Sequence, residues 1–370
     1  MAVNEEINFV ETNAEVLNDE LLNAVQAYLG KILYPGDEKR LLLQAISYAF
    51  TDVLNHINTT GRSNLLRYAT GASLDAIGEL YGNSRLEAEH ASTTIAFTIS
   101  EMQNSGVIIP AGTRVTPDGL IFFATDADLI FEAETETLTK SISATATEAG
   151  KSYNGFAPGQ INALVDTNPY IMSVTNTTVS EGGTDIETDD EYRERLQLSP
   201  FSFSVAGPAN SYRAIALSVS NQIADAQAYS PVPGDVEIAI VLKDGVLPEA
   251  DGEILTKVLE ACSADDVRPL TDHVRVVPAT AVTVAIDAKY YVANGDTTVA
   301  AAVLKAVDEY KTWQCEKIGR DINPDRLRDL MLAAGAAMIT INSPVYHKVP
   351  DGSVAQISDT SVTYGGSISI

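Results

Sequence analysis

The side chains that could do chemistry are scattered along this chain rather than grouped. The four histidines have no metal-ligand spacing to one another or to a cysteine, and no H-E-x-x-H sequence occurs: His56, His90, His273 and His347. The two cysteines, Cys262 and Cys315, lie in no nucleophile or redox motif and are too few for a disulfide framework. These residues predict no catalytic centre, no metal and no cofactor, so we expect a protein that is not an enzyme.

Two short segments resemble ligand loops and fail at the position that matters. Gly150-Lys151-Ser152 ends like a phosphate-binding loop, but Thr145 stands where G-x-x-x-x-G-K-S requires its first glycine. The acids that begin at Asp185 alternate like a calcium loop, but Asp190 stands where that loop requires glycine. The first segment is predicted to be a turn between strands. A carboxylate pair for glycoside hydrolysis stays open, although Trp313 is the only tryptophan available for a sugar cleft.

The charge balance excludes two classes of partner. The chain has 50 acidic and 24 basic residues, for a net charge of −26. Binding of nucleic acid or of an anionic membrane needs clustered Lys and Arg, so neither is expected. The acidic start also argues against a secretory signal peptide, and no apolar run approaches the ~20 residues that span a bilayer.

Residues 1–90 are predicted to be helical. Apolar residues recur at helical spacing over 17–30 and 37–59, and a third helix is expected over 74–81. Two explanations of the apolar faces stay open, an intramolecular hairpin and a bundle with other chains. The residues proposed for the inter-chain contact are Leu21, Leu22, Val25, Leu42, Ile46, Val53 and Leu54.

The remaining chain is predicted to be α+β, in several domains. Alternation and frequent turns over 91–181 indicate an antiparallel β domain, a small sandwich or barrel, with the best strands at 93–100, 120–125, 137–147 and 170–179. Residues 205–345 alternate strands with helices and are expected to form one or two α+β units. Residues 346–370 are predicted to be a strand-like C-terminal arm.

Residues 182–204 are predicted to be a joint, consisting of a glycine turn and a capped helix. Two glycines permit a sharp reversal, and Thr188 with Glu191 has the S/T-x-x-E spacing of a capping box. Acids with later arginines offer i,i+4 pairs, and Ser199-Pro200 is expected to end the helix soon afterwards. The residues of this motif are Gly182, Gly183, Thr184, Asp185, Glu187, Thr188, Glu191, Arg193 and Arg195.

The same motif resembles one shared by baseplate J-like proteins, which are wedge components of contractile phage tails and related injection machines. Three further segments resemble the family in the same order, so the resemblance covers roughly residues 65–345: 109–126, 148–159 and 206–236. It implies a structural subunit in which two copies join a smaller wedge protein through N-terminal helices. It also implies a ring of neighbouring wedges around a central hub, near the sheath, which relays the trigger for contraction.

Applied to this chain, the resemblance places 205–345 in wedge-to-wedge contacts and makes 182–195 a rigid joint. The expected location is the tail baseplate of the virion, with the host cytoplasm during assembly. The alternative is a β-rich module that binds carbohydrate or another surface, which the Thr- and Ser-rich β domain favours and the helical N-terminus does not.

Overall fold

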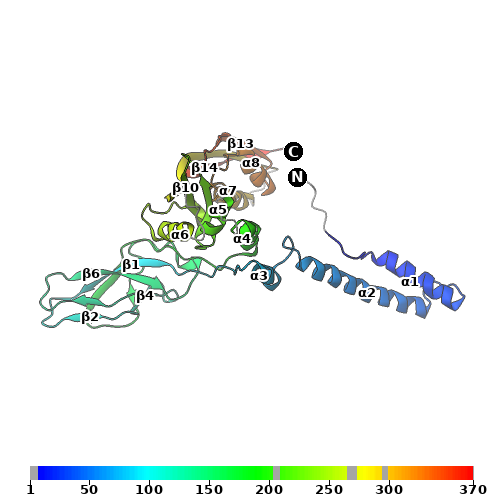
Figure 1. Ribbon diagram of the computed structural model, residues 1–370, viewed down its shortest axis with the longest axis horizontal. Helices are drawn as coiled ribbons and strands as arrows, with labels where there is room; N and C mark the ends of the chain where they lie inside the picture. The colour runs from blue at the N-terminus through cyan, green and yellow to red at the C-terminus, as the bar shows by residue number, and fades with distance from the viewer. Residues whose placement is uncertain (1–6, 203–208, 265–272, 294–298, 370) are drawn as a thin grey trace. The chain divides into compact units, whose positions relative to one another are not determined.

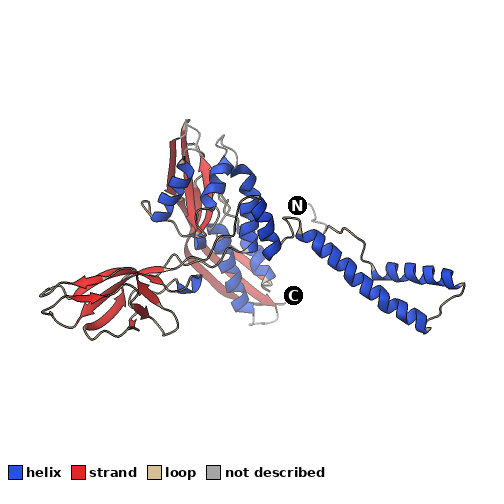
Figure 2. Cartoon of the chain, turned by 60° about the horizontal axis from the view of Figure 1, so that its bottom comes forward, coloured by secondary structure: helices blue, strands red, loops and turns tan. Residues whose placement is uncertain are grey.

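The computed structural model describes residues 7–202, 209–264, 273–293 and 299–369. The chain divides into two compact units. Unit 1 comprises residues 1–85 and 189–196, and unit 2 comprises 86–188 and 197–370. The predicted fold class is confirmed, with N-terminal helices, an antiparallel β domain and α+β parts (Figures 1 and 2).

Three helices make up most of unit 1: α1 (Ala14–Leu29), α2 (Glu38–Ser63) and α3 (Gly71–Leu80). The side chain of Asn13 accepts hydrogen bonds from the first backbone N–H groups of α1, and Asp37 does the same for α2. Gly30 ends α1 in the left-handed conformation, with φ of 64°. α1 and α2 form an antiparallel hairpin (Figure 1), so the intramolecular explanation of their apolar faces is correct for part of each face.

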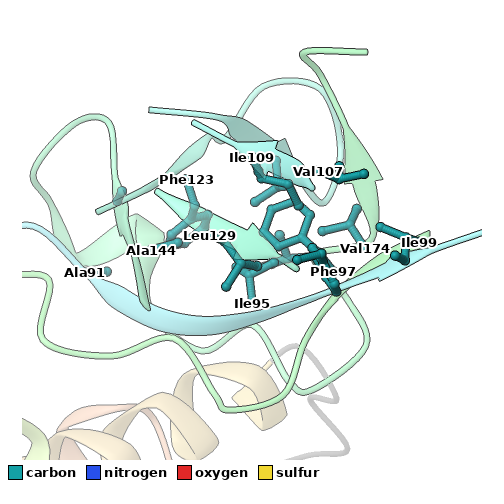
Figure 3. Packing of buried hydrophobic residues seen from close by; sticks show 14 of the residues in the cluster. Ala91, Ile95, Phe97, Ile99, Val107, Ile109, Phe123, Leu129, Ala144 and Val174 are labelled. Atoms are coloured by element: carbon teal, nitrogen blue, oxygen red, sulfur yellow. The ribbon is translucent and has the colours of Figure 1, made fainter. Parts of the chain in front are cut away.

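Residues 86–188 of unit 2 form a nearly closed antiparallel barrel. Its six-stranded sheet has the order β7-β3-β4-β6-β1-β8, and a two-stranded ribbon, β2-β5, packs with it. The core that they enclose includes Ile95, Phe97, Ile109 and Phe123 (Figure 3). These residues and Phe131 of the same core are fully buried. The strands are β1 (Ser92–Ile99), β2 (Val107–Ile109), β3 (Arg114–Thr116), β4 (Phe123–Thr125), β5 (Leu129–Phe131), β6 (Thr139–Ala146), β7 (Ala163–Leu164) and β8 (Ile171–Asn176).

The first α+β part follows α4 (Asp189–Ser202). Its sheet has the order β11-β10-β9, with β9 antiparallel and β11 parallel to β10. Buried residues of α5 and α6 pack on this sheet. The elements are α5 (Ala209–Leu217), β9 (Ile223–Tyr229), β10 (Asp235–Leu242), α6 (Glu253–Ser263) and β11 (His273–Pro278).

The second α+β part is built on β12 (Thr280–Ala293), the middle strand of the sheet β13-β12-β14. Helices α7 (Val299–Cys315) and α8 (Pro324–Ala333) cover one face of this sheet through Val307, Tyr310, Leu327 and Met331. The remaining strands are β13 (Met338–Ser343) and β14 (Ser353–Ile368). The expected C-terminal arm is therefore an integral strand, because β14 pairs in parallel with β12 along its whole length.

Two predictions need adjustment or fall outside the described residues. Pro200 does not end its helix, since α4 continues to Ser202 with Pro200 inside it. Residues 206–208, the start of the third segment that resembles the family, lie outside the described residues. Within the described part of the chain, no helix has the length and apolarity needed to cross a membrane.

Candidate functional site: the glycine motif joint and the exposed face of α2

Gly183 allows two backbone segments to approach more closely than a side chain would permit. A Cβ atom on Gly183 would lie 2.4 Å from the carbonyl oxygen of Gly150. Asn154 fixes the approach from the other side, since its Oδ1 accepts a hydrogen bond from Gly183 N at 2.8 Å and its Nδ2 donates to Gly183 O at 2.7 Å. Neighbouring Gly182 has φ of 89°, which reverses the chain. The glycine pair is therefore required by geometry.

The segment that resembled a phosphate loop packs against this motif. Lys151–Tyr153 form a single 3-10 turn, as expected of a connection between strands. Lys151 N donates to the Asp185 carboxylate at 3.0 Å, and Lys151 Nζ pairs with Asp244 at 2.7 Å. These contacts give Lys151 a structural role at the joint.

Glu89 binds three elements of unit 2 together. Its backbone forms an antiparallel bridge with Thr184, with both N–H···O distances 3.0 Å, and its carbonyl also accepts Gly150 N. Its carboxylate accepts Ser220 Oγ at 2.7 Å and Gln222 Nε2 at 2.6 Å. A charged acceptor makes stronger hydrogen bonds than a neutral one, so this side chain ties the barrel firmly to the start of β9.

Asn221, which is buried, extends the connection. Its Nδ2 donates to the backbone oxygen of Asp185 at 2.5 Å, and its Oδ1 accepts Lys243 Nζ at 2.9 Å. Glu187 is also buried, and its carboxylate accepts Leu86 N at 2.9 Å. The motif residues from Gly182 to Glu187 thus lie together at the end of the barrel where β1 begins.

The second half of the motif belongs to unit 1, where it supplies part of the core. Tyr192 is fully buried beside Leu74, and its hydroxyl donates to Asn83 O at 2.7 Å. The guanidinium groups of Arg85 and Arg195 each lie 5.0 Å from the centre of the Tyr192 ring. Cation–π contacts of this kind hold the ring in place.

The charged residues at the start of α4 have partners other than those predicted. Asp189 accepts Gly71 N at 3.1 Å and pairs with Arg85 at 2.7 Å; these two contacts lower the pKa of Asp189. Arg193 pairs with Asp190 and donates to Ala69 O, and its charge also lowers the pKa of Asp189. The helix begins directly after Thr188, the position predicted for the N-cap. Tertiary contacts thus add to the local charge interactions of this helix start.

The predicted interface residues divide between the two faces of the hairpin. Leu22 is buried, and Leu21, Val25 and Leu54 are half-buried, so the hairpin itself covers much of them. By contrast, Leu42 and Val53 are 61% and 53% exposed, and Ile46 is exposed as well. Phe50 and Ile57 continue the same row. We define the α2 stripe as these exposed apolar residues: Leu42, Ile46, Phe50, Val53 and Ile57.

The α2 stripe is a continuous surface. At 100° per residue its five members fall within about a quarter of the helix circumference. Next to the stripe on the helix circumference lie Leu43, Ser47 and Leu54, which are buried or half-buried, and Ser47 hydrogen-bonds Asn18 of α1. The apolar side of the helix is therefore broad, and within the described residues the part that forms the stripe is uncovered.

Cys262 and Cys315 are buried free thiols, and burial raises the pKa of Cys262 to about 12. The Nδ1 atom of His90 lies 2.8 Å from Ala146 O. In the part of the chain that the structure describes, no three His, Cys, Asp or Glu side chains gather as a metal site.

Comparison with known proteins assigns two of these parts. The family model of the baseplate J-like protein barrel domain matches residues 94–183, and that of the baseplate J-like central domain matches 204–278. Baseplate protein J of Escherichia phage P2 is 30% identical over 187 residues, which are 49% of this chain and 61% of that protein. Both matched regions are domains of the baseplate J-like family.

A structural likeness at lower similarity also exists. A chain of the anti-feeding prophage baseplate, from a six-fold symmetrised cryo-EM structure, has a TM-score of 0.43 and 13% identity, covering 92% of this chain and 90% of that one. The chain spans about three-fifths of the length of the P2 protein.

In the terms of this family, the motif joint lies between two recognised domains. The barrel match ends at 183 and the central-domain match begins at 204, so Thr184 and all of α4 fall between them. The α2 stripe lies outside both matches.

The motif could be predicted from the sequence, but the residues that hydrogen-bond to it could not. Glu89, Asn154 and Asn221 lie outside the helices and strands and are among many polar residues of this chain. The only local signal was the polar run Ser220-Asn221-Gln222 immediately before a predicted strand.

Proposed function

We propose that this chain is a structural wedge subunit of the baseplate of a contractile phage tail or related injection particle. The family assignment supports a baseplate protein, and the α2 stripe is the observation that carries the subunit role. Five large apolar side chains in one row, exposed after the hairpin has formed, are typical of a protein interface.

The size of the α2 stripe suits a permanent helical contact. From Leu42 to Ile57 it runs about 23 Å along the helix at 1.5 Å per residue. Full burial of a side chain of this size contributes roughly 1.5–3 kcal/mol, so several together favour a stable complex. The partners proposed are a second copy of the chain and a smaller wedge protein, whose helices complete a bundle with α2.

The motif joint has the properties of a rigid connection. Glu89, Asn154 and Asn221 hold the barrel, the glycine motif and the start of β9 in one hydrogen-bonded assembly. A rigid body of this kind suits a subunit that contacts neighbouring wedges through 205–345 and lies near the central hub and sheath. We propose that it relays the trigger for sheath contraction within the virion baseplate, after assembly in the host cytoplasm.

The test is incorporation of the chain into particles. In Ile46→Asp/Val53→Asp two charges enter the α2 stripe, while in Gln44→Asp/Asn55→Asp the same charges enter exposed positions on the other side of α2. The amount of each variant in purified particles is measured by immunoblot, and helicity by circular dichroism.

We expect incorporation of the stripe variant to fall at least about tenfold, since ~1.4 kcal/mol already gives that factor. The control variant should assemble normally. A stripe variant that assembles like wild type would contradict the helical contact, and absence of the wild-type chain from particles would contradict the function itself.

A further inference from the structure

The end of the barrel opposite the joint has an unusual surface. β1 begins at the joint with Ser92, which bridges to Glu181, and runs to Ile99. At about 3.3 Å per residue, its eight residues place Ile99 roughly 25 Å away from the joint. Three loops meet there, residues 100–106, 132–138 and 165–170, and we call this end the barrel tip.

Hydrogen bonds hold the three loops together. Ser100 N donates to Tyr170 O at 3.1 Å, which joins the first loop to the third. Glu134 N donates to Gln103 O at 2.8 Å, which joins the second loop to the first. The barrel tip is therefore a single continuous surface.

Large apolar side chains stand exposed on this surface. Met102 is 55% exposed and Tyr170 is 46% exposed. Met172 is 70% exposed and is the extra residue of a β-bulge, since Ile99 pairs with Ile171 and Thr98 with Ser173. Bulges redirect side chains at strand ends, and the flexible thioether of methionine adapts to irregular partner surfaces.

The charge of the tip has one sign. The first two loops carry four exposed acids, and residues 100–106, 132–138 and 165–172 contain no Lys, Arg or His: Glu101, Glu132, Glu134 and Glu136. No described base forms an ion pair with any of these four carboxylates. Asp166 in the third loop is already paired with Arg114 at 2.8 Å.

We infer that the barrel tip is a docking surface for a protein segment that is basic and partly apolar. The four carboxylates supply the complementary charge, and Met102, Tyr170 and Met172 supply the apolar contact that a fully polar acidic loop would lack. A second copy of this chain does not suit the tip, because the chain carries a net charge of −26 and the barrel offers few bases. The inference rests on the proposed function only in locating the partner within the particle.

A photo-cross-linking amino acid placed in the full chain tests this within assembled particles. It replaces Met172 at the tip or, as the matched control, Leu120, which is 82% exposed near the joint end of the barrel. Cross-linked peptides are identified by mass spectrometry. We expect the Met172 position to cross-link to a different chain, at a segment in which Lys and Arg exceed Asp and Glu, and the Leu120 position not to reach that segment.

Charge variants give the second measurement. Glu101→Gln/Glu132→Gln/Glu136→Gln should reduce the Met172 cross-link at least about fivefold, whereas Glu249→Gln/Glu260→Gln/Glu309→Gln, with the same charge change elsewhere, should not. Raising the salt concentration during assembly should weaken the cross-link in the wild type more than in the tip variant.

The outcomes separate the two proposals. If the wild-type chain is absent from particles, the baseplate function fails. If the chain is present but Met172 cross-links to nothing, to a second copy, or to an acidic segment, the docking inference fails and the baseplate function stands.

Discussion

The carboxylate of Glu89 lies 2.9 Å from the backbone nitrogen of Asn221, and this hydrogen bond joins the segment just before β1 of the barrel to the start of β9. The same carboxylate accepts hydrogen bonds from the side chains of Ser220 and Gln222, while the Glu89 carbonyl accepts hydrogen bonds from the backbone N–H groups of Gly150 and Thr184. One residue therefore satisfies donors from three separated segments of the chain.

Replacing Glu89 should loosen this connection. Glu89→Ala leaves three donors at residues 220–222 without their acceptor, at a cost of about 1–3 kcal/mol for groups that stay buried. Urea unfolding should show the loss, and proteolysis between the barrel and β9 should become faster. The matched control is Glu87→Ala, an exposed neighbour. Equal stability of the two variants would show that Glu89 does not hold the joint.

Replacing Gly78 of α3 with alanine should lower the stability, whereas the same replacement at an ordinary helix glycine raises it. Gly→Ala inside an exposed helix stabilises by about 1 kcal/mol, but here the new Cβ would lie 1.8 Å from the Tyr192 hydroxyl oxygen. We expect Gly78→Ala to destabilise unit 1 by roughly 1–3 kcal/mol, the range for overpacking.

A double-mutant cycle with Tyr192→Phe checks the cause. Removing the hydroxyl should recover only part of the cost of Gly78→Ala, since the ring carbon Cζ of residue 192 and Asn83 O remain close to the new Cβ, at 2.7 and 2.8 Å. Additive effects in chemical denaturation would show that the two residues do not meet.

Asp189 should make the stability of unit 1 depend on acid pH. Its pKa lies below the ordinary 3.8 because of its hydrogen bond from Gly71 and its pairing with Arg85. A depressed pKa means that the stabilisation is complete above about pH 4 and is lost as pH falls through the folded value. In thermal melts Asp189→Asn should therefore be less stable than wild type at pH 7, and this difference should shrink near pH 2.5.

The control for this comparison is Glu79→Gln, which removes an exposed acid from α3. It should leave the pH profile unchanged. A constant difference between wild type and Asp189→Asn at every pH would show that the carboxylate charge is not the cause.

Thr188→Ala should weaken the start of α4. The helix begins at Asp189, so Thr188 occupies the N-cap position, where loss of a threonine side chain costs about 1 kcal/mol. An exposed threonine in a barrel loop, Thr137→Ala, is the control. An unchanged unfolding midpoint for Thr188→Ala would show that the capping box does not form.

The elements with a clear period could be predicted from the sequence, and the tertiary partners could not. α2 and β12 follow from apolar spacing, whereas three-residue strands such as β2 and β5 are too short to show alternation. The tail was expected to be a separate arm, because nothing in its polar sequence reveals its pairing with β12.

The motif illustrates the same limit. Its glycine turn and its helix start could be predicted because local backbone geometry requires particular residue types there. The structural roles of Glu89 and Asn221 could not be predicted, since their partners are distant in sequence and either residue alone would suit a solvated turn. The tertiary partners of Arg193 were not predicted for the same reason, as this side chain reaches Leu66 and Ala69 across more than a hundred residues.

Unit 1 is discontinuous in sequence, and this affects the order in which the chain folds. Its core combines Leu74 with Tyr192 and Leu196, and the entire barrel segment separates Leu74 from the other two in the sequence. Closing a flexible loop of ~100 residues costs about 4 kcal/mol in chain entropy. The folded barrel removes most of that cost, because the bridge between Glu89 and Thr184 already brings its two ends together. The barrel is thus a template for unit 1 during folding, and we expect defects in the barrel to delay the core of unit 1.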